Sequence, residues 1–127
     1  MPSLHLNWFF PVLEGVLFGF LALVLHEVGH AIVALAIGVK VKRFGLHWKG
    51  VYLLREAGPP AKNLVISAAG PVTNTVLILT WYWWPVFGLA NLCFALFNIL
   101  PLESSDGERM LKCWRQMREA RLSAQAD

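Results

Sequence analysis

The chain has 127 residues, 57% of them apolar, and its mean hydropathy is positive, which is typical of one small membrane domain rather than a soluble one. The net charge of +3 comes from two blocks of Lys and Arg, residues 40–62 and 109–121. By the positive-inside rule both blocks face the cytoplasm, so the charge reports topology and gives no indication of a nucleic-acid partner.

The first predicted element is a helix over Pro11–Ile37, which is long enough to cross a bilayer with some tilt. Pro11 suits the first turn of this helix and Gly38 suits its end. No basic residue precedes the apolar run, and no small-residue cleavage site follows it. We therefore expect the helix to remain in the mature protein rather than to act as a signal peptide.

Alternation and glycines over Val39–Leu54 predict a β-hairpin or small sheet. After a loop at 56–60, a second helix is predicted from residue 63 or 64 to about Thr80, and a third from Val86 to about Leu100. Each of these helices has about 15 to 17 residues, slightly short for a standard bilayer. Beyond Gly107 a polar helical pattern predicts an amphipathic helix at the inner leaflet, with a solvated tail as the alternative.

These elements predict a mainly α membrane fold. It has three transmembrane helices, a β-hairpin between the first and the second, and a C-terminal amphipathic helix. We divide it into a membrane-embedded core, residues 1–107, and a cytoplasmic or interfacial helix, residues 108–127. Aromatic residues near the start of the chain and at 81–84 mark the outer interface, so we expect the N-terminus outside and the C-terminus in the cytoplasm.

Inside the first helix, the run His26-Glu27-Val28-Gly29-His30 has the spacing of a zinc-hydrolase motif. Two imidazoles four residues apart lie about 40° from each other around a helix, so both can ligate one metal ion. Glu27 can then activate a water molecule as general base. Two satisfied core histidines are the alternative, but burying an ionisable cluster at membrane depth costs several kcal/mol, which favours a functional site.

A catalytic zinc needs a third protein ligand. Asp106 is the best candidate among the later carboxylates, because it directly follows the third helix on the cytoplasmic side, toward which the two histidines lie. Glu103 and Glu108 are the competing candidates.

Three segments resemble the ordered signatures of the site-2 protease family of intramembrane zinc metalloproteases: residues 26–30, residues 70–74 (Gly-Pro-Val-Thr-Asn) and residues 98–107, which begin Asn-Ile-Leu-Pro and end Asp-Gly. The resemblance covers about residues 10 to 110. It implies one zinc ion per chain, ligated by His26, His30 and Asp106, with Glu27 as the base. The chain departs from the family pattern in the Glu-Ser-Ser run before Asp106 and in having Glu108 where a second glycine is common.

The same resemblance assigns further residues. Asn98 would line the active site, to orient the substrate strand or stabilise the oxyanion, with a helix-packing amide as the alternative. Gly70 and Pro71 would let the helix backbones approach closely, and Asn74 would bond across to a freed carbonyl, so these three roles are structural.

The predicted function is an intramembrane zinc endopeptidase that hydrolyses peptide bonds in or near the transmembrane segment of membrane-anchored substrates, as in regulated intramembrane proteolysis. We expect an integral protein of a prokaryotic cell membrane, whose partners are the substrate and the lipid bilayer. Self-association or a regulatory membrane partner stays open. The hairpin would either pair with an unwound substrate strand or merely cover the site.

Two alternatives come from other functional classes. A degenerate family member would bind metal as a scaffold or chaperone without proteolysis, and the presence of Glu27 argues against it, since this residue is needed for hydrolysis but not for metal binding. A structural subunit holding a quinone or haem would carry paired histidines on separate helices, and the spacing of four on one helix argues against that.

Overall fold

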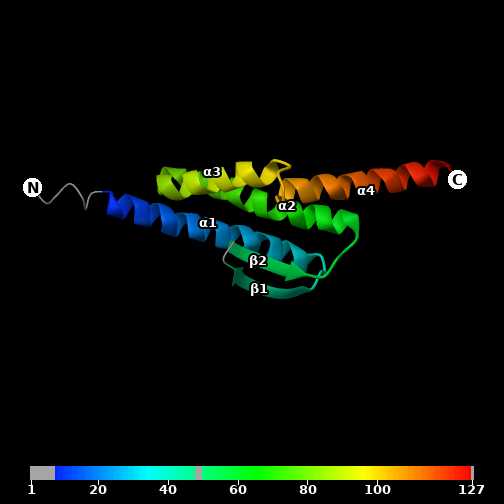
Figure 1. Ribbon diagram of the computed structural model, residues 1–127, viewed down its shortest axis with the longest axis horizontal. Coiled ribbons are helices and arrows are strands. Elements are labelled where there is room, and N and C mark those ends of the chain that lie inside the picture. Colours follow the sequence, from blue (N-terminus) through cyan, green and yellow to red (C-terminus); the bar gives the residue numbers. More distant parts are fainter. Residues whose placement is uncertain (1–7, 48–49, 127) are drawn as a thin grey trace, which may run out of the picture.

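The computed structural model describes residues 8–47 and 50–126. Its elements in chain order are α1 (Phe9–Ala36), β1 (Val41–His47), β2 (Gly50–Arg55), α2 (Pro60–Leu77), the 3-10 helix η1 (Ile78–Tyr82), α3 (Pro85–Ile99) and α4 (Asp106–Ala126). Figure 1 shows an elongated molecule in which α2 packs against α1, α3 and α4, while the strands lie beside the C-terminal half of α1. The structure is therefore mainly helical with one small sheet, as predicted.

Two helices in the described residues are long and apolar enough to cross a membrane. The first is α1, with 28 residues, and the second is the continuous segment Pro60–Tyr82, with 23 residues. Helix α3 is apolar but has only 15 residues. A third crossing made by α3 stays a prediction.

Helix α2 is longer than predicted because it begins at Pro60, inside the segment expected to be a loop. Proline is favoured at the first helical position, where its missing N–H has no helical acceptor in any case. Asn63 supports this start, since its side-chain amide donates to the carbonyl of Gly58 at 2.6 Å. With η1 following directly, the segment is no longer short for a bilayer.

The strands form an antiparallel hairpin in which Phe44 lies opposite Leu53 and Leu46 lies opposite Val51, so the predicted hairpin is confirmed. The two residues that join the strands, 48–49, lie outside the described residues. Strand β2 packs against α1, and this contact places one strand of the hairpin over the helix that carries the histidines.

Glycine lets α1 and α2 approach closely at the depth of the histidines. A Cβ atom on Gly29 would lie only 3.0 Å from the Cβ of Thr73 and 3.2 Å from the carbonyl oxygen of Ala69. A Cβ on Gly70 would lie 2.6 Å from the imidazole of His26. Close backbone contact through small residues is how membrane helices pack. Pro71 follows inside α2, which continues as a helix through it.

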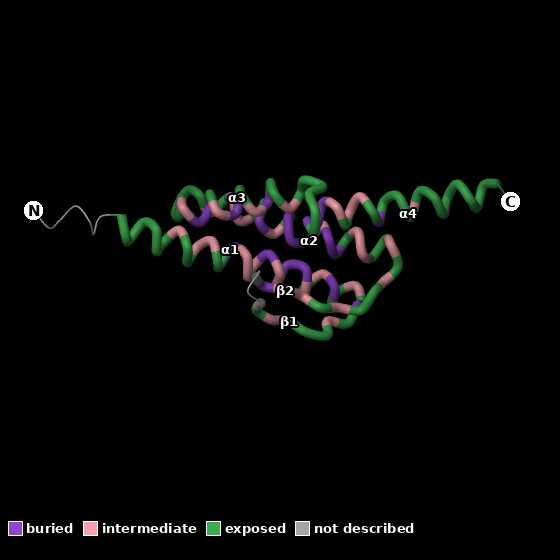
Figure 2. Tube along the Cα trace, in the orientation of Figure 1, coloured by how far each residue is buried: buried purple, intermediate pink, exposed green. Residues whose placement is uncertain are grey.

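Buried residues concentrate where α1, α2, α3 and the first turn of α4 meet, and the outer parts of the helices are exposed (Figure 2). Helix α4 runs without a break across the boundary predicted between residues 107 and 108. It continues in the direction of α3, along the long axis of the molecule (Figure 1).

Candidate metal centre

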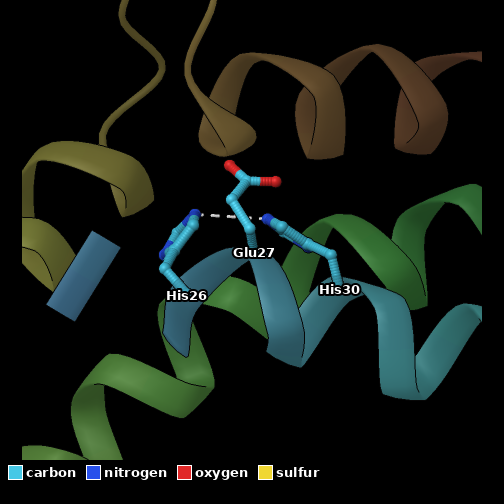
Figure 3. Close-up of side chains that lie close together, drawn as sticks. All are labelled: His26, Glu27 and His30. Carbon is cyan, nitrogen blue, oxygen red and sulfur yellow. Dashed lines mark hydrogen bonds between the residues drawn. The ribbon is translucent and has the colours of Figure 1, made fainter. Parts of the chain in front are cut away.

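The two histidines of α1 present their rings to the same buried point. Their Nε2 atoms lie 3.2 Å apart, and both residues are buried. Figure 3 shows the Glu27 side chain projecting from α1 between the two histidines, with its carboxylate farther from the helix than their rings. One ligand atom from each of these three side chains lies within 4.8 Å of the others. The spacing read from the sequence therefore corresponds to a cluster in space.

Asp106, from the far end of the chain, completes this cluster. Its Oδ2 atom lies 2.8 Å from Nε2 of His26 and 3.1 Å from Nε2 of His30, and the residue is buried. Asp106 is the first residue of α4, and its other oxygen, Oδ1, lies 3.4 Å from the guanidinium of Arg109 one turn later. The structure thus brings together the predicted ligands and Glu27.

A capping arrangement fixes where α4 begins. The backbone N–H of Glu108 donates to Oγ of Ser105 at 3.1 Å, and the backbone N–H of Ser104 donates to Oε2 of Glu108 at 2.9 Å. This closely resembles a capping box, which satisfies the free N–H groups of a helix start. The serines and glutamate that depart from the family pattern therefore serve to start the helix at Asp106.

Glycine is required directly after Asp106. A Cβ at Gly107 would overlap the carbonyl oxygen of Ile99 and lie 2.6 Å from that of Leu100. The end of α3 and the start of α4 can therefore meet only if residue 107 has no side chain. This contact holds the Asp106 carboxylate at the depth of the histidines.

The competing carboxylates do not reach the cluster. Glu108 is engaged by the cap and by Lys112, whose Nζ lies 2.7 Å from Oε1. Glu103 is exposed. Neither lines the cavity beside the histidines.

Each histidine makes a second hydrogen bond through its other ring nitrogen. Nδ1–H of His30 donates to the backbone carbonyl of Ile66 at 2.6 Å, and Nδ1–H of His26 donates to Oδ1 of Asn74 at 2.5 Å. Such contacts orient metal-binding imidazoles and leave Nε2 free as the ligand atom. Asn74 also donates to the carbonyl of Ala22 at 3.2 Å, so its side chain links α2 to α1.

The donor set and its spacing fit a zinc ion. Two imidazole lone pairs and one carboxylate oxygen converge within 3.2 Å, an arrangement of acceptors that needs a cation among them. Zinc binds such ligands at about 2.0 to 2.2 Å in a tetrahedron, which places the ligand atoms roughly 3.3 Å apart.

A cavity of about 130 Å³ opens beside the cluster. Its lining residues come from α1, β2, α2 and α4: Glu27, His30, Val51, Tyr52, Leu53, Arg55, Ile66, Ser67, Asp106 and Arg109. A larger cleft of about 440 Å³ shares Leu53, Arg55, Ser67 and Arg109 with it. Asn98 lines neither, and its side-chain amide donates to the carbonyl of Phe94 in its own helix at 3.0 Å.

Sequence reasoning missed several residues around this centre. Asn91 is fully buried against Asn74, and its signal was a lone amide in the middle of an apolar helix. Arg109 was detectable as the residue one helical turn after Asp106. Tyr52 and Arg55 lie in the hairpin, and no local pattern shows which of its faces covers the site.

Comparison with known proteins agrees with this geometry. Residues 3–102 match the peptidase M50B-like family. The chain belongs to this family. Over 121 residues it is 34% identical to a provisionally named zinc metalloprotease of Synechocystis sp., which aligns with 83% of this chain and 32% of that protein. A zinc metalloprotease of Methanocaldococcus jannaschii is 31% identical over 107 residues, covering 73% of this chain and 32% of that one.

A solved structure is also similar. The site-2 protease from Methanocaldococcus jannaschii superposes with a TM-score of 0.66 at 28% identity, over 80% of this chain and 53% of that one. The predicted resemblance to site-2 proteases is thereby confirmed. The chain spans about a third of the length of these two curated relatives and about half of the solved chain.

Proposed function

We propose that this chain is the catalytic core of an intramembrane zinc endopeptidase, which cleaves membrane-anchored substrates in or near their spanning segment. The observation that carries the proposal is the convergence of His26, His30 and Asp106 within 3.2 Å, with Glu27 beside them on the wall of a cavity. Membership of the M50B-like family and the names of the relatives support zinc as the metal and proteolysis as the reaction.

The residues divide into metal ligands and a base. A zinc ion held by His26, His30 and Asp106 would supply a Lewis acid, which polarises the scissile carbonyl and makes water more acidic. Glu27 is then not needed as a ligand, because three protein ligands suffice for a catalytic site. Its carboxylate takes a proton from the attacking water as the new C–O bond forms, and passes that proton to the leaving amine as the C–N bond breaks.

The hairpin supplies a route for substrate binding. A spanning helix hides its amides, so a substrate has to unwind before cleavage, and its freed N–H and C=O groups need new partners. Strand β2 lines the cavity through Val51, Tyr52 and Leu53, and it belongs to a two-stranded sheet in the described part of the chain. Its other edge can therefore pair with an extended substrate, which is β-strand addition.

Charge and aromatic residues support an orientation in the membrane. Most of the basic residues belong to the hairpin, which lies near the middle of the long axis, and to α4, which extends to one end of the molecule (Figure 1). The exposed aromatics Trp81, Tyr82, Trp83 and Trp84 join η1 to α3 toward the opposite end. We place the basic end in the cytoplasm, with the N-terminus outside and α4 extending from the inner membrane surface.

The test of this proposal measures metal and cleavage together. The full chain, purified in detergent, should contain about one zinc per chain and cleave a single-span model substrate. A chelator should stop cleavage, and added zinc should restore it. A chain that binds no zinc contradicts the proposal, whereas a chain that binds zinc and cleaves no substrate supports the non-proteolytic scaffold instead.

A further inference from the structure

A chain of buried amides leads away from the metal centre through three helices. Oδ1 of Asn74 in α2 accepts from Nδ1–H of His26, and Nδ2 of Asn74 donates to Oδ1 of Asn91 in α3 at 2.8 Å. Nδ2 of Asn91 in turn donates to the backbone carbonyl of Phe87 at 2.8 Å. We propose that Asn91 is a positioning residue of the metal centre, acting through Asn74 to fix which ring nitrogen His26 presents to the metal.

The direction of these hydrogen bonds is set at a backbone carbonyl. The oxygen of Phe87 can only accept, so the amide nitrogen of Asn91 has to face it. The side-chain oxygen of Asn91 then faces Asn74 and can only accept from it. Because the carbonyl belongs to the helix backbone, it cannot be reversed by a side-chain rotation.

The same constraint passes through Asn74. Its nitrogen faces two acceptors, Oδ1 of Asn91 and the carbonyl oxygen of Ala22 at 3.2 Å. A flipped Asn74 would turn its oxygen toward both acceptors and its nitrogen toward His26. In the observed orientation its oxygen faces Nδ1 of His26, so Nδ1 has to carry the hydrogen and Nε2 keeps the lone pair that a metal needs.

Burial makes it costly to reverse the direction of these hydrogen bonds. Asn74 and Asn91 are both 0% exposed, so bulk water does not compete for their hydrogen bonds. A buried polar group left without a partner costs about 1–3 kcal/mol, and a flip of Asn74 would disrupt several partners at once. His30 needs no such relay, because its Nδ1–H donates directly to the backbone carbonyl of Ile66. Both histidines thus carry the hydrogen on Nδ1 and the lone pair on Nε2, His30 through a backbone carbonyl and His26 through the two asparagines.

Variants of Asn91 separate this role from simple packing. Asn91→Leu fills a similar volume but removes the acceptor for Asn74. Asn91→Asp restores that acceptor. Burial favours the neutral carboxylic acid, whose C=O accepts from Asn74 and whose O–H donates to the carbonyl of Phe87. Thr75→Val is the matched control, since the hydroxyl of Thr75 donates only to the carbonyl of Pro71 within its own helix.

Zinc affinity is the first readout, measured on the full chain in detergent by competition with a chromophoric chelator. Loss of a residue behind a metal ligand typically weakens metal binding 10- to 100-fold, so Asn91→Leu should raise the zinc Kd about tenfold or more. Asn91→Asp and Thr75→Val should stay within about threefold of the unmodified chain. Equal losses in Asn91→Leu and Asn91→Asp, or no loss in Asn91→Leu, would overturn the proposal.

A second readout needs no variant and therefore does not depend on how Asn91→Leu folds. Nitrogen-15 NMR of the zinc-loaded, unmodified chain should show His26 bound to zinc through Nε2, with a slowly exchanging proton on Nδ1. Ligation through Nδ1 would overturn the relay. This inference rests on the proposed zinc site, but the two can fail separately. Absence of zinc from the unmodified chain refutes the proposed function. Normal zinc binding by Asn91→Leu refutes only the role of Asn91.

Discussion

Oδ2 of Asp106 lies 2.8 Å from Nε2 of His26, although the two residues are 80 positions apart in the chain. The contact depends on two features near Asp106: a cap that starts α4 at this residue, and a glycine that lets α4 meet the end of α3. The metal centre therefore depends on how α4 begins beside the end of α3 as well as on the motif in α1.

Asp106→Asn tests the third ligand. The amide keeps the shape of the carboxylate but loses its charge, and we expect zinc affinity to fall more than about 100-fold, beyond the usual effect of a residue behind the ligands. Glu103→Gln is the control, because Glu103 is exposed and lines no part of the cavity. Metal content after dialysis measures both, and a greater loss in Glu103→Gln would reassign the ligand.

Gly70→Ala tests the close approach of α2 to the histidines. The added methyl group would lie 2.6 Å from the imidazole of His26, so the rings or the helices have to shift. We expect a loss of about 1–3 kcal/mol in stability from overpacking, together with weaker zinc binding. Thermal unfolding in detergent and chelator competition measure the two effects.

Gly19→Ala is the control for this substitution. Gly19 lies in α1, which is also long and apolar enough to cross a membrane, but a Cβ there has no atom within 4 Å. It should leave zinc affinity unchanged. If both alanine variants bind zinc like the unmodified chain, the helices are not packed as closely at Gly70 as the structure has them.

Ser105→Ala tests the cap that places Asp106. Removing Oγ leaves the N–H of Glu108 without its acceptor, and loss of an N-cap typically costs about 1 kcal/mol. We expect a lower unfolding temperature and weaker zinc binding, because the start of α4 becomes less well defined. Ser123→Ala, near the other end of α4, removes only a bond to Glu119 in the same helix and should change neither quantity.

Strand addition is tested by photocrosslinking. A probe at Leu53 in β2, which lines the cavity, should capture a membrane-anchored substrate, whereas a probe at Lys42 in β1 should not. Zinc-free chain or the Glu27→Gln variant would hold the substrate without cleaving it. Capture from Lys42 with none from Leu53 would refute pairing along β2.

The sequence predicted the elements of this fold better than their ends. Hydropathy and alternation located α1 and the hairpin, since both depend on residue patterns within one segment. The start of α2 at Pro60 was missed because proline can either break a helix or begin one, and the packing around Asn63 decides between them. The cap at Ser105 was interpreted as a departure from the family, although its spacing to Glu108 was visible.

In the candidate site, too, the sequence predicted what depends on one segment and missed what depends on contacts between helices. His26, Glu27 and His30 were predictable because helix geometry alone places them together. Asp106 was indicated by its position directly after the third helix and then by the family resemblance. The partnership of Asn74 and Asn91 was not predictable, because no local pattern states which face of one helix meets which face of another. The contact of Asn98 with its own helix likewise depends on a rotamer that the sequence does not specify.

Glu27→Gln tests the central claim most directly, because it separates metal binding from hydrolysis. Three other side chains converge on the metal position, so the variant should keep about one zinc per chain. Loss of a general base should slow cleavage of a single-span substrate by about 10²- to 10⁴-fold. Cleavage at the unmodified rate by a zinc-loaded Glu27→Gln chain would contradict the account.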